Sequence, residues 1–342
     1  MEKRPESSAP DPLGVGAVIK IGKTKPFIIT LEDHYWDREL VALFADRDGK
    51  RPQKIQDRMY DVGALRLKDM DEAGIDLQIL SHGSPGVQLL EAETAVGLAR
   101  ETNDRLHQLI QAHPKRFAAF ATLPTPDPKA AADELERVVT KLGFKGAMLH
   151  GLTHGRLFID DKRFWPIFER AQALDVPLYI HPAYPPAEVI DVYYGDYASR
   201  YPSIIGPVQG YTVESSTQAI RLVLSGAFDA YPRLKFVLGH LGEGLPAMLW
   251  RIDRYLPPLG PNAHSFSEIF RQNFYITTSG NFSTSSLLCS VMELSVDRIM
   301  FSVDWPYDSN LHAVEWMNGV PLSPDDKHKI FGGNAKRLLR ID

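Results

Sequence analysis

Short runs of apolar residues, many of them β-branched or aromatic, recur along the chain from Pro26 onward. Most of the runs are continuous rather than alternating, and this pattern is typical of parallel strands that are buried on both faces. Eight such runs predict strands, at Phe27–Leu31, Asp76–Leu80, Phe117–Thr122, Gly146–His150, Pro177–His181, Lys235–Gly239, Phe274–Thr278 and Ile299–Val303.

The segments between these strands carry apolar residues near helical spacing. The predicted helices are Glu91–His113, Pro128–Leu142, Asp161–Leu174, Thr212–Ala230, Gly244–Tyr255 and Ser283–Leu294. Eight strands that alternate with helices predict an α/β fold of the (β/α)8, or TIM barrel, type. An open, doubly wound sheet is the alternative, and it would place its ligands around one switch point.

Two stretches depart from a minimal barrel, one after the first strand and one after the fifth. Asp37–Tyr60 is polar, and Ala183–Tyr211 is rich in tyrosine and proline. Both follow the carboxyl ends of strands, where the active-site loops of barrels grow, so they are candidate lids or pocket walls. Packing or contacts between subunits are the alternative. Extra C-terminal helices are expected at Asn310–Asn318, Pro324–Phe331 and Asn334–Arg340, with Ser323 and Asn334 as N-caps.

The composition of the 342-residue chain, 44% hydrophobic and 24% charged, is ordinary for a soluble globular protein. Residues 26–342 suit one barrel domain, and residues 1–25, rich in Pro, Ser and charge, are expected to form a flexible tail. A net charge of −5 gives no sign of a nucleic-acid surface, and no stretch predicts a membrane span. The single cysteine, Cys289, excludes an intramolecular disulfide and fits a cytoplasmic location.

Polar residues with metal-binding side chains follow four of the apolar runs: Glu32-Asp33-His34, His181, His240 and Asp304. Glu32 and His34 are two residues apart, which places both on the same face of an extended strand, here the barrel interior. A histidine or aspartate at a strand end is, taken alone, more often structural. Four strand ends with such residues predict a metal centre at the carboxyl-terminal mouth of the barrel. Two carboxylates and two imidazoles, from Glu32, His34, His181 and Asp304, make a mixed site with room for a water or substrate.

Gly239-His240-Leu241-Gly242-Glu243-Gly244 is expected to form a turn from strand to helix. His240 is either a further ligand or an acid/base group, and Glu243 is within reach of the same pocket or only complements a helix dipole. His82 and His150 also end predicted strands, and a structural role is favoured for both.

These motifs resemble the amidohydrolase superfamily. Glu-x-His, His-Pro, Gly-His-x-Gly-Glu and Ser-x-Asp-x-Pro-Tyr are similar to the branch that contains aminocarboxymuconate-semialdehyde decarboxylase and the aromatic acid decarboxylases. The resemblance covers Pro26–Asp342, with further matches at Asp69–Asp76, Ser84–Gln88, Gly143–Ala147 and Asn334–Leu338. Many hydrolases of the superfamily begin with His-x-His, whereas this chain has Glu32 in the first position, as do γ-resorcylate and 2,3-dihydroxybenzoate decarboxylases. No candidate for a bridging, carbamylated lysine is found, which implies a single metal ion.

The resemblance implies a metal-dependent, non-oxidative decarboxylase of an ortho-hydroxy aromatic carboxylic acid, active as a homodimer or homotetramer. The implied metal ligands are Glu32, His34, His181 and Asp304, and Asp304 is also the implied proton donor. His240 and Glu243 would be the paired acid/base and positioning groups. Arg251 matches an arginine that reaches a neighbouring subunit's substrate in relatives.

Tyr35, Trp36, Phe282, Trp305 and Tyr307 neighbour the ligand positions, and barrel packing is expected for at least half of them. Trp36 and Tyr307 are the candidates for the aromatic wall of the substrate pocket. The divalent metal is expected to be Mn2+, with Zn2+ as the alternative. Two functions compete with decarboxylation: a metal-dependent lactonase acting on a cyclic carboxylate, and a non-catalytic barrel that binds an aromatic acid.

Overall fold

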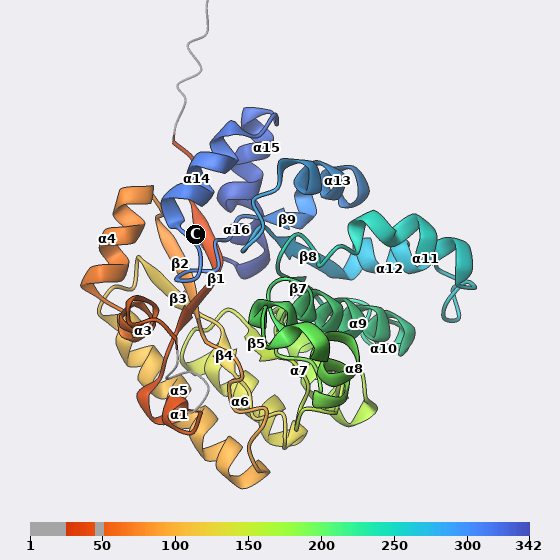
Figure 1. Ribbon diagram of the computed structural model, residues 1–342, viewed down its shortest axis with the longest axis horizontal. Coiled ribbons are helices and arrows are strands. Elements are labelled where there is room, and N and C mark those ends of the chain that lie inside the picture. The colour runs from red at the N-terminus through yellow and green to blue at the C-terminus, as the bar shows by residue number, and fades with distance from the viewer. Residues whose placement is uncertain (1–24, 45–50) are drawn as a thin grey trace, which may run out of the picture.

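The computed structural model describes residues 25–44 and 51–342 (Figure 1). The tail predicted for residues 1–25 therefore lies outside the described residues, apart from Lys25. Within the described part of the chain, no helix is both long enough and apolar enough to cross a membrane.

The strands form a closed ring of parallel neighbours. They are β1 (Ile29–Tyr35), β2 (Leu77–His82), β3 (Phe117–Ala119), β4 (Ala121–Thr122), β5 (Ala147–His150), β6 (Leu178–His181), β7 (Phe236–Leu238), β8 (Phe274–Thr277) and β9 (Ile299–Met300). They pair in sequence order as two parallel sheets, β1–β3 and β4–β9. The third predicted strand is split at Phe120, whose N–H donates to the Leu80 carbonyl at 2.9 Å.

The ring closes between β1 and the segment that follows β9. Asp304 N–H donates to the Glu32 carbonyl at 3.0 Å, and His34 N–H donates to the Trp305 carbonyl at 2.8 Å. These bonds continue the parallel ladder around the barrel, so the predicted (β/α)8 fold is confirmed and the doubly wound sheet is excluded.

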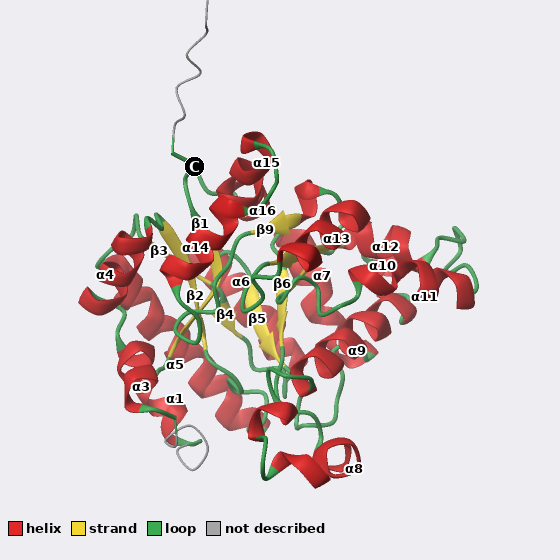
Figure 2. Cartoon of the chain, turned by 45° about the horizontal axis from the view of Figure 1, so that its top comes forward, coloured by secondary structure: helices red, strands yellow, loops and turns green. Residues whose placement is uncertain are grey.

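The helices surround the barrel (Figures 1 and 2). They are α1 (Arg38–Ala42), α3 (Gln53–Tyr60), α4 (Ala64–Ala73), α5 (Ala92–Gln111), α6 (Pro128–Lys141), α7 (Trp165–Leu174), α8 (Ala187–Ala198), α9 (Gly210–Leu224), α10 (Ala227–Ala230), α11 (Leu249–Tyr255), α12 (Phe266–Asn273), α13 (Thr284–Leu294), α14 (Asn310–Gly319), α15 (Pro324–His328) and α16 (Asn334–Leu339). Short 3-10 turns cover Lys162–Phe164, Pro202–Ile205, Pro246–Met248 and Val296–Arg298, and Lys329–Gly333 forms a π-helical turn.

Several boundaries differ from the prediction. β1 runs four residues beyond the predicted Leu31, because its polar residues face the barrel interior and still hydrogen-bond to their neighbours. Helix α12 was not predicted, although Ser265 and Glu268 form a complete capping box at its start. Ser323 is an N-cap as predicted, but Asn334 is not. Its side-chain amide instead donates to the carbonyls of Val296 and Ile299, at 2.8 and 2.7 Å.

Both predicted insertions follow strand ends at the mouth of the barrel. The first contains α1 and α3, and the second contains α8 and the 3-10 turn Pro202–Ile205. The opposite end of the barrel interior is apolar. There a buried cluster of inward side chains packs under α16, and it includes Leu31, Phe120, Tyr179, Val237 and Met300. This apolar layer forms a rigid floor below the polar side chains at the mouth.

Candidate metal centre and active-site cavity

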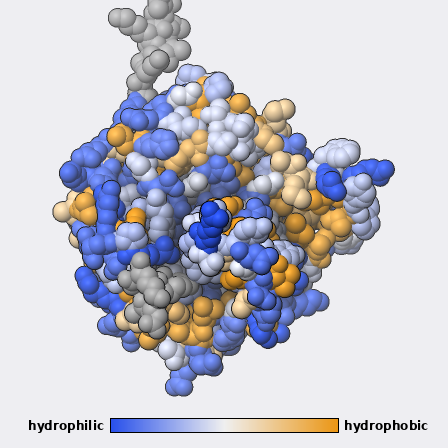
Figure 3. Space-filling model, in the orientation of Figure 1, coloured by the Kyte–Doolittle hydropathy of each residue, from blue (hydrophilic) through white to orange (hydrophobic). Residues whose placement is uncertain are grey.

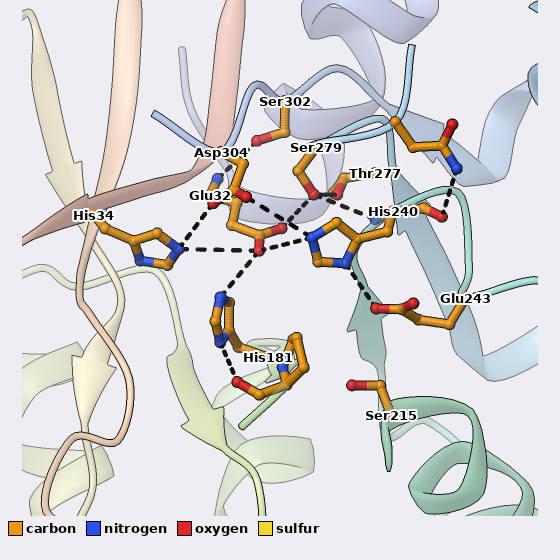
Figure 4. Close-up of polar contacts among 12 residues, drawn as sticks. Glu32, His34, His181, Ser215, His240, Glu243, Thr277, Ser279, Ser302 and Asp304 are labelled. Atoms are coloured by element: carbon orange, nitrogen blue, oxygen red, sulfur yellow. Dashed lines mark hydrogen bonds and ion pairs between the residues drawn. The ribbon is translucent and has the colours of Figure 1, made fainter. Parts of the chain in front are cut away.

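Four of the predicted ligand side chains converge at the carboxyl ends of the strands (Figure 4). Glu32 and His34 lie on β1, His181 ends β6, and Asp304 follows β9. One ligand atom from each residue lies within 4.8 Å of the other three. The barrel thus brings together side chains from three strands that are far apart in the sequence.

The donor atoms of this cluster fit a divalent cation. Glu32 Oε1, His34 Nε2 and Asp304 Oδ1 are buried and lack a hydrogen-bond partner within residues 25–44 and 51–342. His34 Nε2 lies 3.3 Å from Asp304 Oδ1, and His181 Nε2 lies 3.2 Å from Glu32 Oε1. Leaving buried polar atoms unpaired costs about 1–3 kcal/mol each, and a cation that all of them face removes this cost. Two oxygens and two imidazole nitrogens suit Mn2+ or Zn2+.

The carboxylate of Glu32 is oriented by hydroxyl groups from neighbouring strands. Its Oε2 accepts hydrogen bonds from Tyr179 and Ser279, and the Tyr179 hydroxyl also lies 2.8 Å from Thr277 Oγ1. These contacts leave Oε1 directed at the other ligands. Gly239 makes room for this arrangement, since a Cβ at that position would lie 2.8 Å from Glu32 Oε2.

The two candidate histidine ligands are each held through the ring nitrogen that faces away from the cluster. His34 Nδ1 lies 3.3 Å from Ser81 Oγ, and His181 Nδ1 lies 2.7 Å from the Pro182 carbonyl. Such outer contacts fix the ring orientation of metal-binding histidines. Asp33, in contrast, points away from the cluster. Its carboxylate accepts from Thr30 Oγ1 and from Gln78 Nε2, so it is not one of the ligands.

Half-buried His240 and buried Glu243 form a pair at the edge of the ligand cluster. His240 Nδ1 lies 2.6 Å from Glu243 Oε1, and Thr212 donates to Glu243 Oε2 at 2.9 Å. On the other side of the ring, His240 Nε2 lies 3.7 Å from Glu32 Oε1 and 4.0 Å from Asp304 Oδ2. His240 therefore stands between Glu243 and the ligands, which is the geometry of an acid/base group.

The backbone around these groups is strained. His240, Leu241 and Glu243 have φ values of 52°, 57° and 54°, and Asp304 has a φ of 74°. Left-handed backbone is unfavourable for residues other than glycine and clusters at functional sites. Gly280, with a φ of 59°, fits against both groups, because a Cβ there would lie 3.0 Å from His240 Cδ2 and 3.3 Å from Asp304 Oδ2.

The electrostatics of the site separate the roles of its groups. Burial opposes ionisation of Asp304, but the nearby imidazoles of His240 and His34 outweigh it and lower the pKa of the carboxyl group. Burial also opposes the charge on His240, yet Glu243 and Glu32 raise its pKa well above the ordinary value. Burial, reinforced by His34, lowers the pKa of His181 to about 4. His181 is therefore neutral near pH 7, as a metal ligand must be.

A cavity of about 690 Å³ opens above the cluster. Figure 3 shows this face of the molecule hollowed near its centre, with hydrophilic side chains around the hollow. The lining includes the ligands His34, His181 and Asp304 and the pair His240 and Glu243. Other lining residues come from the insertions and the loops, among them Arg51, Ser84, Tyr184, Tyr211, Asn281 and Tyr307. The volume lies within the range that small-molecule sites occupy, about 300–1,000 Å³.

Of the three residues predicted to bind the substrate, one lines the cavity and two do not. Tyr307 lines the cavity, and its ring centroid lies 6.0 Å from that of His34. Trp36 packs instead against Tyr60 and Met59, in a buried cluster beside the barrel. Arg251 lies on the exposed surface of α11, near Tyr255, and does not line the cavity of its own chain.

Arg51, Tyr184 and Tyr211 are among the cavity residues that the sequence analysis did not single out. The Arg51 guanidinium lies 4.9 Å from the centroid of the Tyr307 ring, and the rings of Tyr184 and Tyr211 lie 5.6 Å apart. All three belong to the two insertions, which were predicted as candidate lids or pocket walls without naming these residues. A cation beside aromatic rings in a cavity suits a flat, anionic ligand.

Comparison with known proteins gives consistent results. The sequence profile of the family described as amidohydrolase matches residues 32–341. The chain is 40% identical over 329 residues to gamma-resorcylate decarboxylase of Rhizobium radiobacter, covering 92% of this chain and 98% of that protein.

Two solved structures are similar over nearly their whole length. A 2,6-dihydroxybenzoate decarboxylase complexed with 2,6-dihydroxybenzoate has a TM-score of 0.86 and 39% identity, covering 92% of this chain and 100% of that one. A dihydroxybenzoic acid decarboxylase from Polaromonas sp. JS666, with bound manganese and the inhibitor 2-nitroresorcinol, also has a TM-score of 0.86 and 39% identity, covering 92% and 97%.

Proposed function

The chain belongs to the amidohydrolase family, and from this premise we propose that it catalyses the metal-dependent, non-oxidative decarboxylation of an ortho-hydroxy aromatic carboxylic acid. It is a carboxy-lyase that releases CO2 and a phenol. The observation that carries this proposal is the cluster of Glu32, His34, His181 and Asp304 below the cavity. Relatives that are about 40% identical over most of the chain catalyse this class of reaction.

The substrate is a hydroxybenzoate. Its flat ring suits a cavity with Tyr184, Tyr211 and Tyr307 in its walls, and its negative charge suits the guanidinium of Arg51. A dihydroxybenzoate is the first compound to test, because the related structures hold 2,6-dihydroxybenzoate and 2-nitroresorcinol.

Glu32, His34, His181 and Asp304 hold one divalent metal ion. Manganese is the expected metal, since a related structure contains it and half of the ligand set is carboxylate oxygen. Zinc stays the alternative. When bound, the metal supplies orientation for the carboxylate and ortho hydroxyl of the substrate, and it stabilises negative charge on their oxygens.

Side chains of the protein carry out the proton transfers. Because the pKa of Asp304 is lowered in the free site, Asp304 first takes a proton from His240, whose pKa is raised. Asp304 then delivers this proton to the ring carbon that carries the carboxylate, and that carbon becomes tetrahedral. The bond to the carboxylate then breaks, CO2 leaves, and the electron pair of the broken bond restores the aromatic ring. His240, between Glu243 and Asp304, returns a proton to Asp304 for the next turnover.

A substrate panel tests the proposal. Purified protein loaded with Mn2+ or Zn2+ is incubated with dihydroxybenzoates and other ortho-hydroxy aromatic acids, and both UV absorbance and released CO2 are measured. Release of one CO2 for each acid consumed is expected. Ring opening of a cyclic carboxylate without CO2 release would favour a lactonase instead.

The role of Asp304 has its own test. Asp304→Asn keeps the size of the side chain but cannot deliver the proton, so turnover should be lost even when the variant is loaded with metal. Decarboxylation near the wild-type rate by a metal-loaded variant would refute this role.

The active unit is a homodimer or homotetramer in which Arg251 of one subunit acts in the pocket of its neighbour. Support comes from the position of Arg251 on exposed α11, beside Trp250 and Tyr255, which are 75% and 77% exposed. Apolar surface of this kind is typical of contacts between subunits. A cytoplasmic location stays a prediction from the sequence.

A further inference from the structure

His150 is a buried histidine beside the metal centre that the proposed reaction does not use. It ends β5 and is 2% exposed, and it does not line the cavity. In the parallel ladder its register partner on β6 is His181, one of the proposed metal ligands. Matched positions on neighbouring strands point to the same side of the sheet, so the two rings lie 4.8 Å apart, inclined at 70°.

The hydrogen bonds of His181 determine where its proton lies. His181 Nδ1 is 2.7 Å from the Pro182 carbonyl oxygen and 3.1 Å from His150 Nδ1. A carbonyl oxygen can only accept, so His181 carries its proton on Nδ1. A hydrogen bond between the two rings then requires His150 Nδ1 to accept the same proton, as a second acceptor beside the Pro182 carbonyl.

The other ring nitrogen of His150 completes the chain. If its Nδ1 accepts, the proton of a neutral His150 ring lies on Nε2, and the ring donates to the main-chain carbonyl of His82. The order of donation is thus His181 Nδ1–H to His150 Nδ1, and His150 Nε2–H to the His82 carbonyl. At the far end, His181 Nε2 keeps its lone pair and faces Glu32 Oε1 at 3.2 Å.

We propose that His150 is a positioning residue that acts together with the Pro182 carbonyl to hold the tautomer and ring orientation of His181, so that His181 Nε2 is free to bind the metal. This inference rests on the proposed function in one respect, namely that His181 is a metal ligand. Outer hydrogen-bond partners of this kind change metal affinity by about 10–100-fold when they are removed.

Two substitutions separate hydrogen bonding from packing. His150→Leu fills much of the same space without an acceptor, whereas His150→Asn places a carbonyl oxygen close to the position of Nδ1. The dissociation constant for Mn2+ is measured by electron paramagnetic resonance on metal-free, full-length protein. His150→Leu should bind Mn2+ about 10–100-fold more weakly than the wild type, and His150→Asn should recover most of the loss. Equal affinity of His150→Leu and wild type, or equal loss in both variants, would overturn the inference.

A second measurement does not depend on the folding of either variant. In wild-type protein labelled with 15N-histidine, the His181 signals are assigned from their loss in His181→Ala. They should report a protonated Nδ1 and a bare Nε2, and a proton on Nε2 contradicts the inference.

His181→Ala also keeps the two proposals distinguishable. If this variant binds Mn2+ as tightly as the wild type, the ligand set under the proposed function is wrong. If it binds weakly while His150→Leu does not, only the role of His150 fails.

Discussion

Replacing Arg66 by methionine should destabilise the protein more than any exposed arginine does, because Arg66 is a fully buried cation beneath two of the ligands. It is 0% exposed, and its Nη2 donates to the His34 carbonyl at 2.5 Å. Its Nε donates to the Asp61 carbonyl at 3.0 Å, and its guanidinium carbon lies 3.9 Å from the centroid of the Trp305 ring. Arg66 thus supports β1 at His34 and the residue that follows Asp304.

The contacts of Arg66 set the expected magnitude. Without the guanidinium, the carbonyls of His34 and Asp61 lose a donor, at about 1–3 kcal/mol each, and the contact with Trp305 is worth roughly 1–2 kcal/mol. Methionine avoids the burial of a charge, which already lowers the pKa of Arg66 to about 9. The net loss of unfolding free energy is therefore expected to be about 3–5 kcal/mol.

Urea denaturation followed by circular dichroism measures this loss. Arg58→Met is the matched control, because Arg58 pairs with Asp69 at 3.1 Å but both side chains are about one-fifth exposed. The control should lose about 1 kcal/mol or less. Arg66→Lys keeps the positive charge but not the planar guanidinium with its several donors. Its loss of unfolding free energy should lie between those of Arg66→Met and Arg58→Met. A loss below about 1 kcal/mol for Arg66→Met would refute the reasoning, since it would mean that the network contributes no more than a surface pair.

Three other measurements test the electrostatics, the assembly and the metal. Burial raises the pKa of Glu214 to about 8, from 4.5 in the unfolded chain. The folded protein therefore binds this proton more tightly than the unfolded chain does. The resulting stabilisation is fully present below pH 4.5 and is lost as the pH rises through 8. Relative to Glu214→Gln, the wild type should lose about 1.4 kcal/mol of unfolding free energy per pH unit within this range. Parallel plots of unfolding free energy against pH for the two proteins would contradict this. Arg251→Ala mixed with Asp304→Asn should regain activity, because a mixed oligomer holds one complete pocket, and no recovery contradicts the role of Arg251. Chelation should abolish CO2 release and added Mn2+ should restore it, whereas full activity of metal-free protein would contradict a metal-dependent reaction.

The sequence predicts the barrel and the ligand cluster for one physical reason. Buried parallel strands are apolar, so Glu32, His181 and Asp304 stand out where they interrupt or end such runs. The same criterion gave a wrong boundary for β1. The predicted strand ends at Leu31, where the apolar run ends, whereas the polar residues that follow continue the strand to Tyr35. Asp33 shows a further limit, since its neighbours on both sides are ligands while its own carboxylate faces Gln78.

Contacts between distant segments could not be predicted in the same way. Arg51 and Tyr184 come from insertions whose conformation depends on packing against the barrel, and no periodic pattern encodes that packing. The pairing of His150 with His181 depends on strand register. One signal for it was present, because the fourth and fifth predicted strands both end in histidine.

The balance of charge at this centre favours an anionic substrate. The two carboxylates of Glu32 and Asp304 match a divalent ion in charge, so the metal centre as a whole would be neutral, and a bound substrate carboxylate would add one unbalanced negative charge. The balancing positive charge must come from elsewhere in the cavity. Arg51 lines the wall, and His240, whose pKa is raised by Glu243 and Glu32, lies beside the ligands. Both cations lie at the cavity, where the carboxylate of an aromatic acid requires positive charge, so the charge balance of the site favours an anionic substrate over a neutral one.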